Sequence, residues 1–460
     1  MKTSLIKKMT LLVAVFLTGT VAFAQQPDSL ASYLEQAARN NPQINADFML
    51  YKASLEKIPQ AGAIPDPELE VGFFFKPMET LMGKQVADFT LMQMFPWFGT
   101  RKAARSEASE MARMAYEKFR DSRNTLWYDV KAQWYQLSNL NEQYKTTENT
   151  IDLLKQLEQL ALTRFSASKN NLSAPSASTS TGGGMNGMAG KSAMGGSSMT
   201  AASGGMSDVL RIQMERAELE NKLTNLASLR VVAEARFNSL LNRTSTSPVA
   251  VPDSLEQVIF QLDEEPMIDS IFTRNPMLTM IDAEADAYRA KAKMDRRMSY
   301  PMIGIGLQYS LINKMDNPIG MPDMNGKDMV MPMVKISLPL FRRKYNAQQR
   351  ENRNYWLATE LKRDNVQNQL HTAYVSASQQ LEDAARKITL YTNQYELSLS
   401  TWQLIVREFS AGRQSLTDVI QVERQMLDYK LKKSEAIAAY NTNVASIEKL
   451  ISTSINVENK

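Results

Sequence analysis

Two long stretches of this chain, 101–169 and 345–411, contain no proline and carry a coiled-coil pattern of apolar residues. In the second stretch these positions follow steps of three and four that average 3.5 residues, at Leu381, Ala384, Ile388, Tyr391, Tyr395, Leu399, Trp402, Val406 and Phe409. At a rise of about 1.5 Å per residue, each stretch predicts a helix roughly 100 Å long. Helices of this length exclude a single compact globule as the fold.

Five segments of the first half of the chain recur in the second half in the same order, which indicates an internal duplication. The matched pairs are Asn40-Asn41-Pro42 with Arg274-Asn275-Pro276, 67–72 with 301–306, 95–101 with 338–344, 164–167 with 408–411, and 207–209 with 417–419. Each copy predicts a helix, two short alternating segments, a very long helix, a turn and another long helix. We therefore expect two repeats, 25–250 and 251–460, with 34 extra residues in the first copy between Lys169 and Ser207.

The short segments predict two β-hairpins, at about 67–95 and at about 302–338. In the first hairpin, alternate positions of one strand are apolar, as at Leu69, Val71 and Phe73. Each strand is about ten residues long, which is the length of a tilted strand that spans a membrane. Soluble hairpins that cap the helices fit the same pattern, so the pattern alone leaves both alternatives open.

The first 24 residues have the composition of a secretory signal peptide. A basic start and a short apolar core at 11–21 precede the small residues Ala22 and Ala24 of a cleavage site. Because this segment holds three lysines, its removal lowers the formal net charge from +4 to +1, which gives no electrostatic basis for binding nucleic acid. The chain has no cysteine and one histidine, His371, which excludes thiol chemistry and most histidine-based sites. We expect an exported protein that is not an enzyme and needs no cofactor.

The stretch Phe409-Ser-Ala-Gly-Arg-Gln-Ser-Leu-Thr-Asp-Val-Ile-Gln421 resembles the helix-turn-helix motif of the TolC-type outer-membrane factor family. The Asn-Pro near the start of each half, and the Pro-Trp-Phe or Pro-Leu-Phe after each predicted hairpin, are further features of that family. The resemblance covers roughly residues 28 to 455 and extends to the heavy-metal (copper and silver) efflux branch. It implies a mainly α-helical fold with a small β part, located in the outer membrane and extending into the periplasm.

The resemblance also implies an assembly. Duplicated coiled-coil helices would form a periplasmic tunnel, and four strands per chain would contribute to a trimeric, 12-stranded β-barrel. The implied partners are a periplasmic adaptor protein, an inner-membrane pump and the lipid of the outer membrane. A physical argument supports the trimer independently: four strands cannot close a barrel, and open sheet edges in lipid leave backbone groups unpaired at several kcal/mol each. Three copies supply twelve strands, an even number that closes.

Four residues near the helical turns are candidates for a periplasmic gate, on the resemblance: Asp208, Asp418, Gln421 and Phe409. In a trimer, three copies of a carboxylate around one axis would repel each other and attract cations. Asp418 also fits a helix cap with Ser415, because acidic residues near a helix start are favoured by the helix dipole. Gln421 stands where the family often has a second acidic residue, which limits the prediction to a single ring. Phe409 fits either a latch of the closed state or an ordinary core residue.

Methionine is unusually common, with 28 residues in the chain. One group lies in a Gly/Ser-rich insertion at about 170–206 and contains Met185, Met188, Met194, Met199 and Met206. A second group, Met315 to Met333, lies in and beside the second predicted hairpin. Thioether sulfur is a soft ligand that suits Cu(I), whereas low-complexity filler explains the first group equally and strand packing explains part of the second.

These observations predict a passive, trimeric exit duct of an efflux system, with Cu(I) and Ag(I) or other heavy-metal ions as the leading substrates. The first alternative is a duct for drugs or other small molecules. The second is a secreted coiled-coil structural or adhesion protein, which would have no barrel and would dissolve without detergent.

Overall fold

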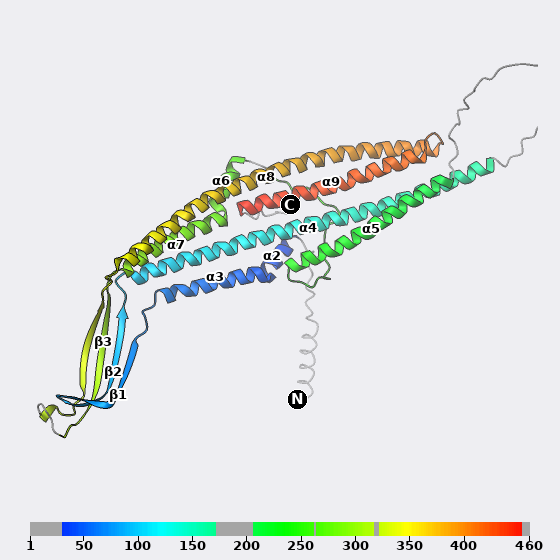
Figure 1. Ribbon diagram of the computed structural model, residues 1–460. Coiled ribbons are helices and arrows are strands. Elements are labelled where there is room, and N and C mark those ends of the chain that lie inside the picture. Colours follow the sequence, from blue (N-terminus) through cyan, green and yellow to red (C-terminus); the bar gives the residue numbers. More distant parts are fainter. Residues whose placement is uncertain (1–29, 172–205, 262–263, 317–321, 453–460) are drawn as a thin grey trace, which may run out of the picture. The chain divides into compact units, whose positions relative to one another are not determined.

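The computed structural model describes residues 30–171, 206–261, 264–316 and 322–452 (Figure 1). The expected signal peptide, 1–24, and most of the methionine-rich insertion lie outside these residues. The chain forms two compact units, each built from segments of both sequence halves. We call them the turn unit (Met1–Asn40, Trp127–Phe260 and Gln379–Ala445) and the sheet unit (Asn41–Leu126, Gln261–Ser378 and Ser446–Lys460).

The predicted order of elements is confirmed in both halves. The first half contains α2 (Leu30–Asn40), α3 (Pro42–Ala61), β1 (Glu68–Thr80), β2 (Gly83–Phe95), α4 (Thr100–Asn171) and α5 (Met206–Leu240). The second half contains α6 (Glu264–Arg274), α7 (Pro276–Met298), β3 (Met302–Asn313), a short 3-10 turn η1 (Pro322–Met324), β4 (Met329–Ser337), α8 (Arg342–Ser410) and α9 (Leu416–Ile451). The proline-free stretches form α4 and α8, of 72 and 69 residues. Within the described ranges, no helix is long and apolar enough to cross a membrane.

The repeated Asn-Pro dipeptide starts a helix in each half. The side chain of Asn41 accepts hydrogen bonds from the backbone N–H groups of Gln43 and Ile44 at 2.9 and 3.3 Å. Asn275 accepts one from Met277 at 2.9 Å. The proline that follows each cap occupies the first helical position, where its missing N–H costs nothing and its fixed φ suits the helix. The two dipeptides therefore set the starts of α3 and α7.

The sheet is antiparallel throughout, with the order β1-β2-β3-β4. Both predicted hairpins are confirmed, and they pair with each other through β2 and β3. Consequently β1 and β4 are the two edges of the sheet within one chain. Pro332 lies in β4, the edge position that tolerates a residue without an N–H donor.

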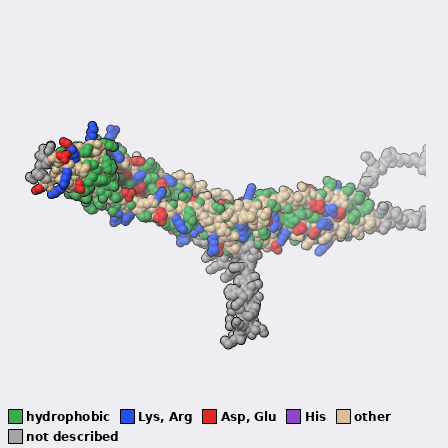
Figure 2. All heavy atoms as spheres, turned by 90° about the horizontal axis from the view of Figure 1, so that it is seen from below, with side chains coloured by type: hydrophobic (Ala, Val, Ile, Leu, Met, Phe, Trp, Pro, Cys, Tyr) green, Lys and Arg blue, Asp and Glu red, His purple; other side chains and the backbone are tan. Residues whose placement is uncertain are grey.

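The two faces of the sheet differ sharply in composition. Residues that share a face follow from the register, since directly paired residues point to the same side. One face, which we call the apolar face, carries Leu69, Val71, Phe73, Ala87, Phe89, Leu91, Gln93, Phe95, Ile303, Ile305, Leu307, Tyr309, Leu311, Val330, Pro332, Val334 and Ile336. Many of these side chains are largely exposed, among them Phe73 at 68% and Val334 at 72%. Apolar side chains accordingly gather over the sheet in Figure 2.

The opposite face, the polar face, contains charged and hydroxyl side chains together with glycine and methionine. Asp88 accepts hydrogen bonds on this face from Ser310 at 2.6 Å and from Gln85. Ser310 is fully buried within the chain although it is polar, and its bond to Asp88 offsets the cost of that burial. An antiparallel sheet with one apolar and one polar face separates two different environments.

Candidate functional site at the helical turns

The turn between α8 and α9 is formed by two backbone hydrogen bonds and a glycine in a left-handed conformation. The backbone N–H of Gly412 bonds to Phe409 O at 3.0 Å, and that of Arg413 bonds to Glu408 O at 2.9 Å. These two bonds close the last turn of α8 in a Schellman motif. Gly412 has φ +79°, a left-handed conformation that glycine adopts without a steric penalty. The glycine of the sequence motif is therefore required by the geometry of the turn.

The start of α9 is capped by Ser415 and Asp418. The N–H of Asp418 donates to Ser415 Oγ at 3.3 Å, and Ser415 Oγ donates to Asp418 Oδ2 at 2.6 Å. Gln414 Nε2 also donates to the same carboxylate oxygen at 2.8 Å. The structure thus contains the hydrogen bonds of the capping alternative, and two donors hold the Asp418 carboxylate in one position. Its role in a gate stays a prediction.

Asp208 occupies the equivalent position in the first turn of α5. It is half-buried, as Asp418 is, and Val209 and Val419 follow the two acids as fully buried residues. Both carboxylates therefore lie at helix N-termini, where the helix dipole favours negative charge. Gln421 is exposed on the next turn of α9.

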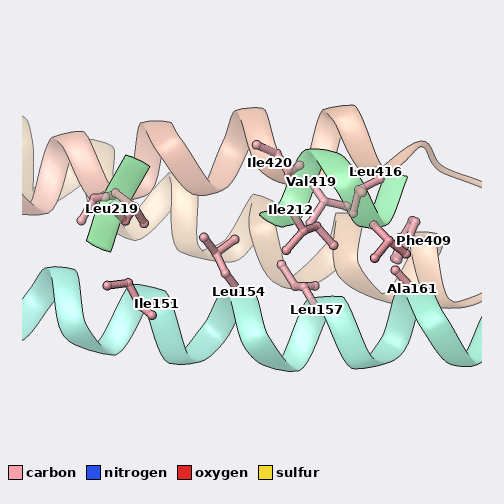
Figure 3. Packing of buried hydrophobic residues seen from close by; sticks show 12 residues of the cluster. Ile151, Leu154, Leu157, Ala161, Ile212, Leu219, Phe409, Leu416, Val419 and Ile420 are labelled. Carbon is pink, nitrogen blue, oxygen red and sulfur yellow. The ribbon is translucent and has the colours of Figure 1, made fainter. Parts of the chain in front are cut away.

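Beneath these turns, four helices share one apolar core (Figure 3). Its members are Ile151, Leu154, Leu157 and Ala161 of α4, Val209, Ile212 and Leu219 of α5, Phe409 of α8, and Leu416, Val419, Ile420 and Leu427 of α9. Ile212 is directed toward Leu157 in Figure 3, so the α4–α5 pair is packed by its own apolar faces. Phe409 is only 1% exposed and belongs to this core. This agrees with its interpretation as a core residue.

Polar contacts join α5 to α9 beside the core. Arg211 donates to Thr417 Oγ1 at 2.5 Å. One turn further, Arg424 Nε donates to both carboxylate oxygens of Glu215 at 2.8 Å, and a second guanidinium nitrogen makes a closer contact. Glu215 is only 5% exposed, so its ion pair with Arg424 offsets the cost of burying the carboxylate. On the other side, Glu158 of α4 accepts from Gln213 and Arg216 of α5 at 2.8 and 2.7 Å.

Glu423 is a further acidic residue of this region, and the sequence motifs do not include it. It lies on the inward stripe of α9, between Ile420 and Leu427, and its side chain is fully buried. Neither of its carboxylate oxygens has a hydrogen-bond partner among the described residues. Burial, and then the neighbouring Glu215 carboxylate, raise the pKa of Glu423 to about 7, while the charge of Arg424 opposes the shift. The sequence did hold a signal, since a glutamate at an apolar heptad position is unusual.

The methionines proposed as metal ligands are mostly outside the part of the chain that the structure describes. Met185, Met188, Met194 and Met199 lie in 172–205, whereas Met206 is exposed at the first position of α5. Within the described ranges, no three His, Cys, Asp or Glu side chains come together as a metal site would need. The structure therefore brings together the gate candidates Asp418 and Phe409 at one turn, and leaves the metal candidates without a described site.

Comparison with known proteins gives a family match in the second half of the chain. Residues 267–453 match the model of the family described as outer membrane efflux protein. This segment of the chain is similar to that family. None of the curated proteins matches the sequence. The match supports the resemblance drawn from the turn motif.

Solved structures confirm the fold over almost the whole chain. The outer membrane protein VceC from Vibrio cholerae is similar with a TM-score of 0.68 at 12% identity, over 92% of this chain and 96% of that chain. CusC has a TM-score of 0.69 at 12% identity, over 92% and 91%. The open state of the Neisseria gonorrhoeae MtrE outer membrane channel has a TM-score of 0.63 at 13% identity, over 92% and 88%. At such identities the likeness establishes the fold: long coiled helices with a four-stranded sheet.

Proposed function

We propose that this chain is the outer-membrane exit duct of a tripartite efflux system. Three copies assemble, their twelve strands close into one barrel, and their helices line a tunnel in the periplasm. The duct is passive: an inner-membrane pump supplies the energy and a periplasmic adaptor protein joins the pump to the helical turns. The match to the outer membrane efflux family supports this assignment for the second half, and the duplication extends it to the first.

The observation that carries the proposal is the sheet with its apolar face and its two open edges. An apolar face of this size in water would be a liability for a monomer. In a bilayer the same face contacts lipid, and the unpaired backbone groups of β1 and β4 must then find partners. Pairing β4 of one protomer with β1 of the next supplies them, and the polar face then lines the interior.

We further propose that the helical turns form the gate. Threefold symmetry would place Asp418 of each protomer around the axis, with Asp208 at the equivalent turn, and both rings would attract cations. The hydrogen bonds from Ser415 and Gln414 that orient Asp418 support a fixed ring. Gln421 would add no charge to it, and Phe409 would act through the core rather than at the surface.

The proposed substrates are Cu(I) and Ag(I) or other heavy-metal ions. The methionine-rich insertion between α4 and α5 supports this choice, because neutral thioethers are soft ligands. A duct for drugs or other small molecules is the alternative, and it would export such compounds with or without the insertion. Tolerance of silver, and of a panel of small toxic compounds, in cells with and without the chain distinguishes the two.

A matched pair of substitutions in β3 tests the channel itself. Leu307 lies on the apolar face and its neighbour Gln308 on the polar face, so the same lysine meets lipid at one position and the interior at the other. In planar lipid bilayers, we expect Gln308→Lys to insert and conduct. Leu307→Lys should lower the folding free energy in the membrane by about 2–4 kcal/mol. Most of this variant should therefore fail to insert. A mature chain that is soluble and monomeric without detergent, or that tolerates both substitutions equally, contradicts the proposal and favours the secreted coiled-coil alternative.

A further inference from the structure

Two rows of paired residues on the polar face of the sheet bring methionines of β2 and β4 onto one side. One row runs Glu68, Met92, Gly306 and Met333, from β1 to β4. The adjoining row contains Met94, Gly304 and Lys335. Thioethers on this face are not explained by contact with lipid, since the apolar face is the opposite one. A member of the second methionine group of the sequence, Met333, therefore shares this face with two methionines of the first hairpin.

The two glycines of β3 leave room for the thioethers of β2. A Cβ atom at Gly304 would lie only 2.5 Å from Met94 Sδ and 3.2 Å from Met92 Sδ. A Cβ atom at Gly306 would lie 2.9 Å from Met92 Sδ. Both methionine side chains thus lie over β3, with their sulfur atoms beside the position that a Cβ atom of residue 304 would occupy. The positions of the glycines and the methionines depend on each other.

Met333 lies on the same face, on the other side of β3 from Met92. It is half-buried and stands directly across Gly306 from Met92. Two strand spacings, about 10 Å, separate the backbones of these two residues, and with glycine between them two flexible methionine side chains can meet. Three thioethers can therefore reach one point on the polar face.

We propose that Met92, Met94 and Met333 form a binding site for a soft monovalent cation, Cu(I) or Ag(I), on the polar face of the sheet. Neutral thioethers bind such ions in preference to hard cations such as Na⁺ or Mg²⁺. Glu68, paired with Met92, supplies a negative charge that offsets the positive charge of Lys335 in the adjoining row. This inference rests on the proposed channel, in which the polar face is the inner wall. A site of moderate affinity there would hold an ion and release it outward.

Silver binding to the full chain in detergent tests the site. To remove the thioethers of the insertion without shortening the chain, the parent protein carries leucine in place of Met185, Met188, Met194, Met199 and Met206. Titration calorimetry with silver nitrate in chloride-free buffer should detect one silver ion per chain that is lost in the triple variant Met92→Leu, Met94→Leu and Met333→Leu. These swaps conserve volume and keep the fold. The matched control replaces three exposed helix methionines, Met49→Leu, Met214→Leu and Met298→Leu, and should bind silver as the parent does.

A second variant tests the geometry while keeping every sulfur. Gly304→Ala should push Met94 and Met92 out of position and weaken silver binding of this site by about tenfold. Equal binding by the parent and the triple variant, or loss in the control as well, overturns the site. Potassium conductance in planar bilayers separates this result from the channel proposal. A protein that conducts but shows no methionine-dependent silver binding refutes the site alone, whereas one that binds silver but never conducts refutes the channel.

Discussion

At the scale of single residues, Glu423 is the group whose environment conflicts most with its chemistry. It is a carboxyl group at an apolar position of α9, fully buried, with Glu215 nearby and Arg424 already engaged by Glu215. Its pKa of about 7, raised from an ordinary 4.5, means that the folded protein holds this group in its neutral form up to neutral pH. An acid that is neutral when folded and ionised when unfolded links folding to pH.

The direction of this pH dependence follows from the raised pKa. Between pH 4.5 and about 7 the folded state binds the proton and the unfolded state does not, so the stabilisation present at low pH is lost as the pH rises toward 7. We expect the detergent-solubilised protein to lose about 2 kcal/mol of unfolding free energy between pH 5 and 8 from this group. Glu423→Gln should remove that dependence. Glu396→Gln, at an exposed position of α8, is the control and should leave it intact; a pH slope unchanged in Glu423→Gln contradicts the argument.

Asp418 allows its two roles to be separated by measurement. If its carboxylate lines the constriction, Asp418→Ala changes the block of single-channel current by cations and leaves trimer stability largely intact. If it acts only as the partner of Ser415, the variant conducts normally and stability falls by about 0.5–2 kcal/mol. Ser415→Ala removes the cap and keeps the charge, so only the stability loss is expected from it. We expect Asp418→Ala to alter the block and Ser415→Ala to leave it unchanged.

Residue roles were predictable from the sequence only where one local pattern defines them. The cap of α9 and the core position of Phe409 were among the expected alternatives, because both follow from spacing along one helix. The pairing of Glu215 with Arg424 joins residues 209 positions apart and needed the fold. The thioethers over Gly304 and Gly306 likewise required the pairing of the first hairpin with the second.

At the scale of elements, the turn between α8 and α9 depends on the backbone conformation of Gly412. A residue with a Cβ at φ +79° is strained by roughly 1–2 kcal/mol. Gly412→Ala should therefore let the last turn of α8 open more often, and the amide of Arg413, bonded to Glu408 O, should exchange its hydrogen about 5- to 30-fold faster. Gly412→Asn should show a smaller effect, since asparagine tolerates the left-handed region. Equal exchange in all three proteins would mean that the turn does not limit opening.

The elements themselves were largely predictable, and the reasons are physical. An unbroken period of 3.5 residues without proline has no other stable outcome than a helix, which is why α4 and α8 were foreseen. The strands of both hairpins were foreseen from alternation. Alternation alone does not predict their pairing into one sheet, which only the resemblance implies, because β2 and β3 are joined by contacts far apart in the sequence. Nor do the compact units follow the two repeats: each draws on both halves.

At the scale of the whole molecule, one chain supplies no hydrogen-bond partner strand for the outer edges of β1 and β4. Within a chain, neighbouring strands alternate in direction, so β1 and β4 run in opposite directions. Joining β4 of one protomer to β1 of the next therefore continues the same antiparallel pattern around a closed ring. The topology of one chain is thus suited to repetition around an axis.

The absence of cysteine from the chain makes this closure directly testable. We expect Val71→Cys in β1, combined in turn with Val330→Cys, Val334→Cys or Ile336→Cys in β4, to cross-link between protomers. All four positions lie on the apolar face, and directly paired residues of adjacent strands have Cβ atoms about 4.5–5.5 Å apart, within reach of oxidation or a short bis-thiol reagent.

At the matching register, denaturing gels should show cross-linked dimers and closed trimers. Each single-cysteine variant should stay monomeric there, because threefold symmetry keeps identical positions apart. Cross-links at no register, with protein correctly inserted, would show that the edges do not meet and that the barrel closes in another way.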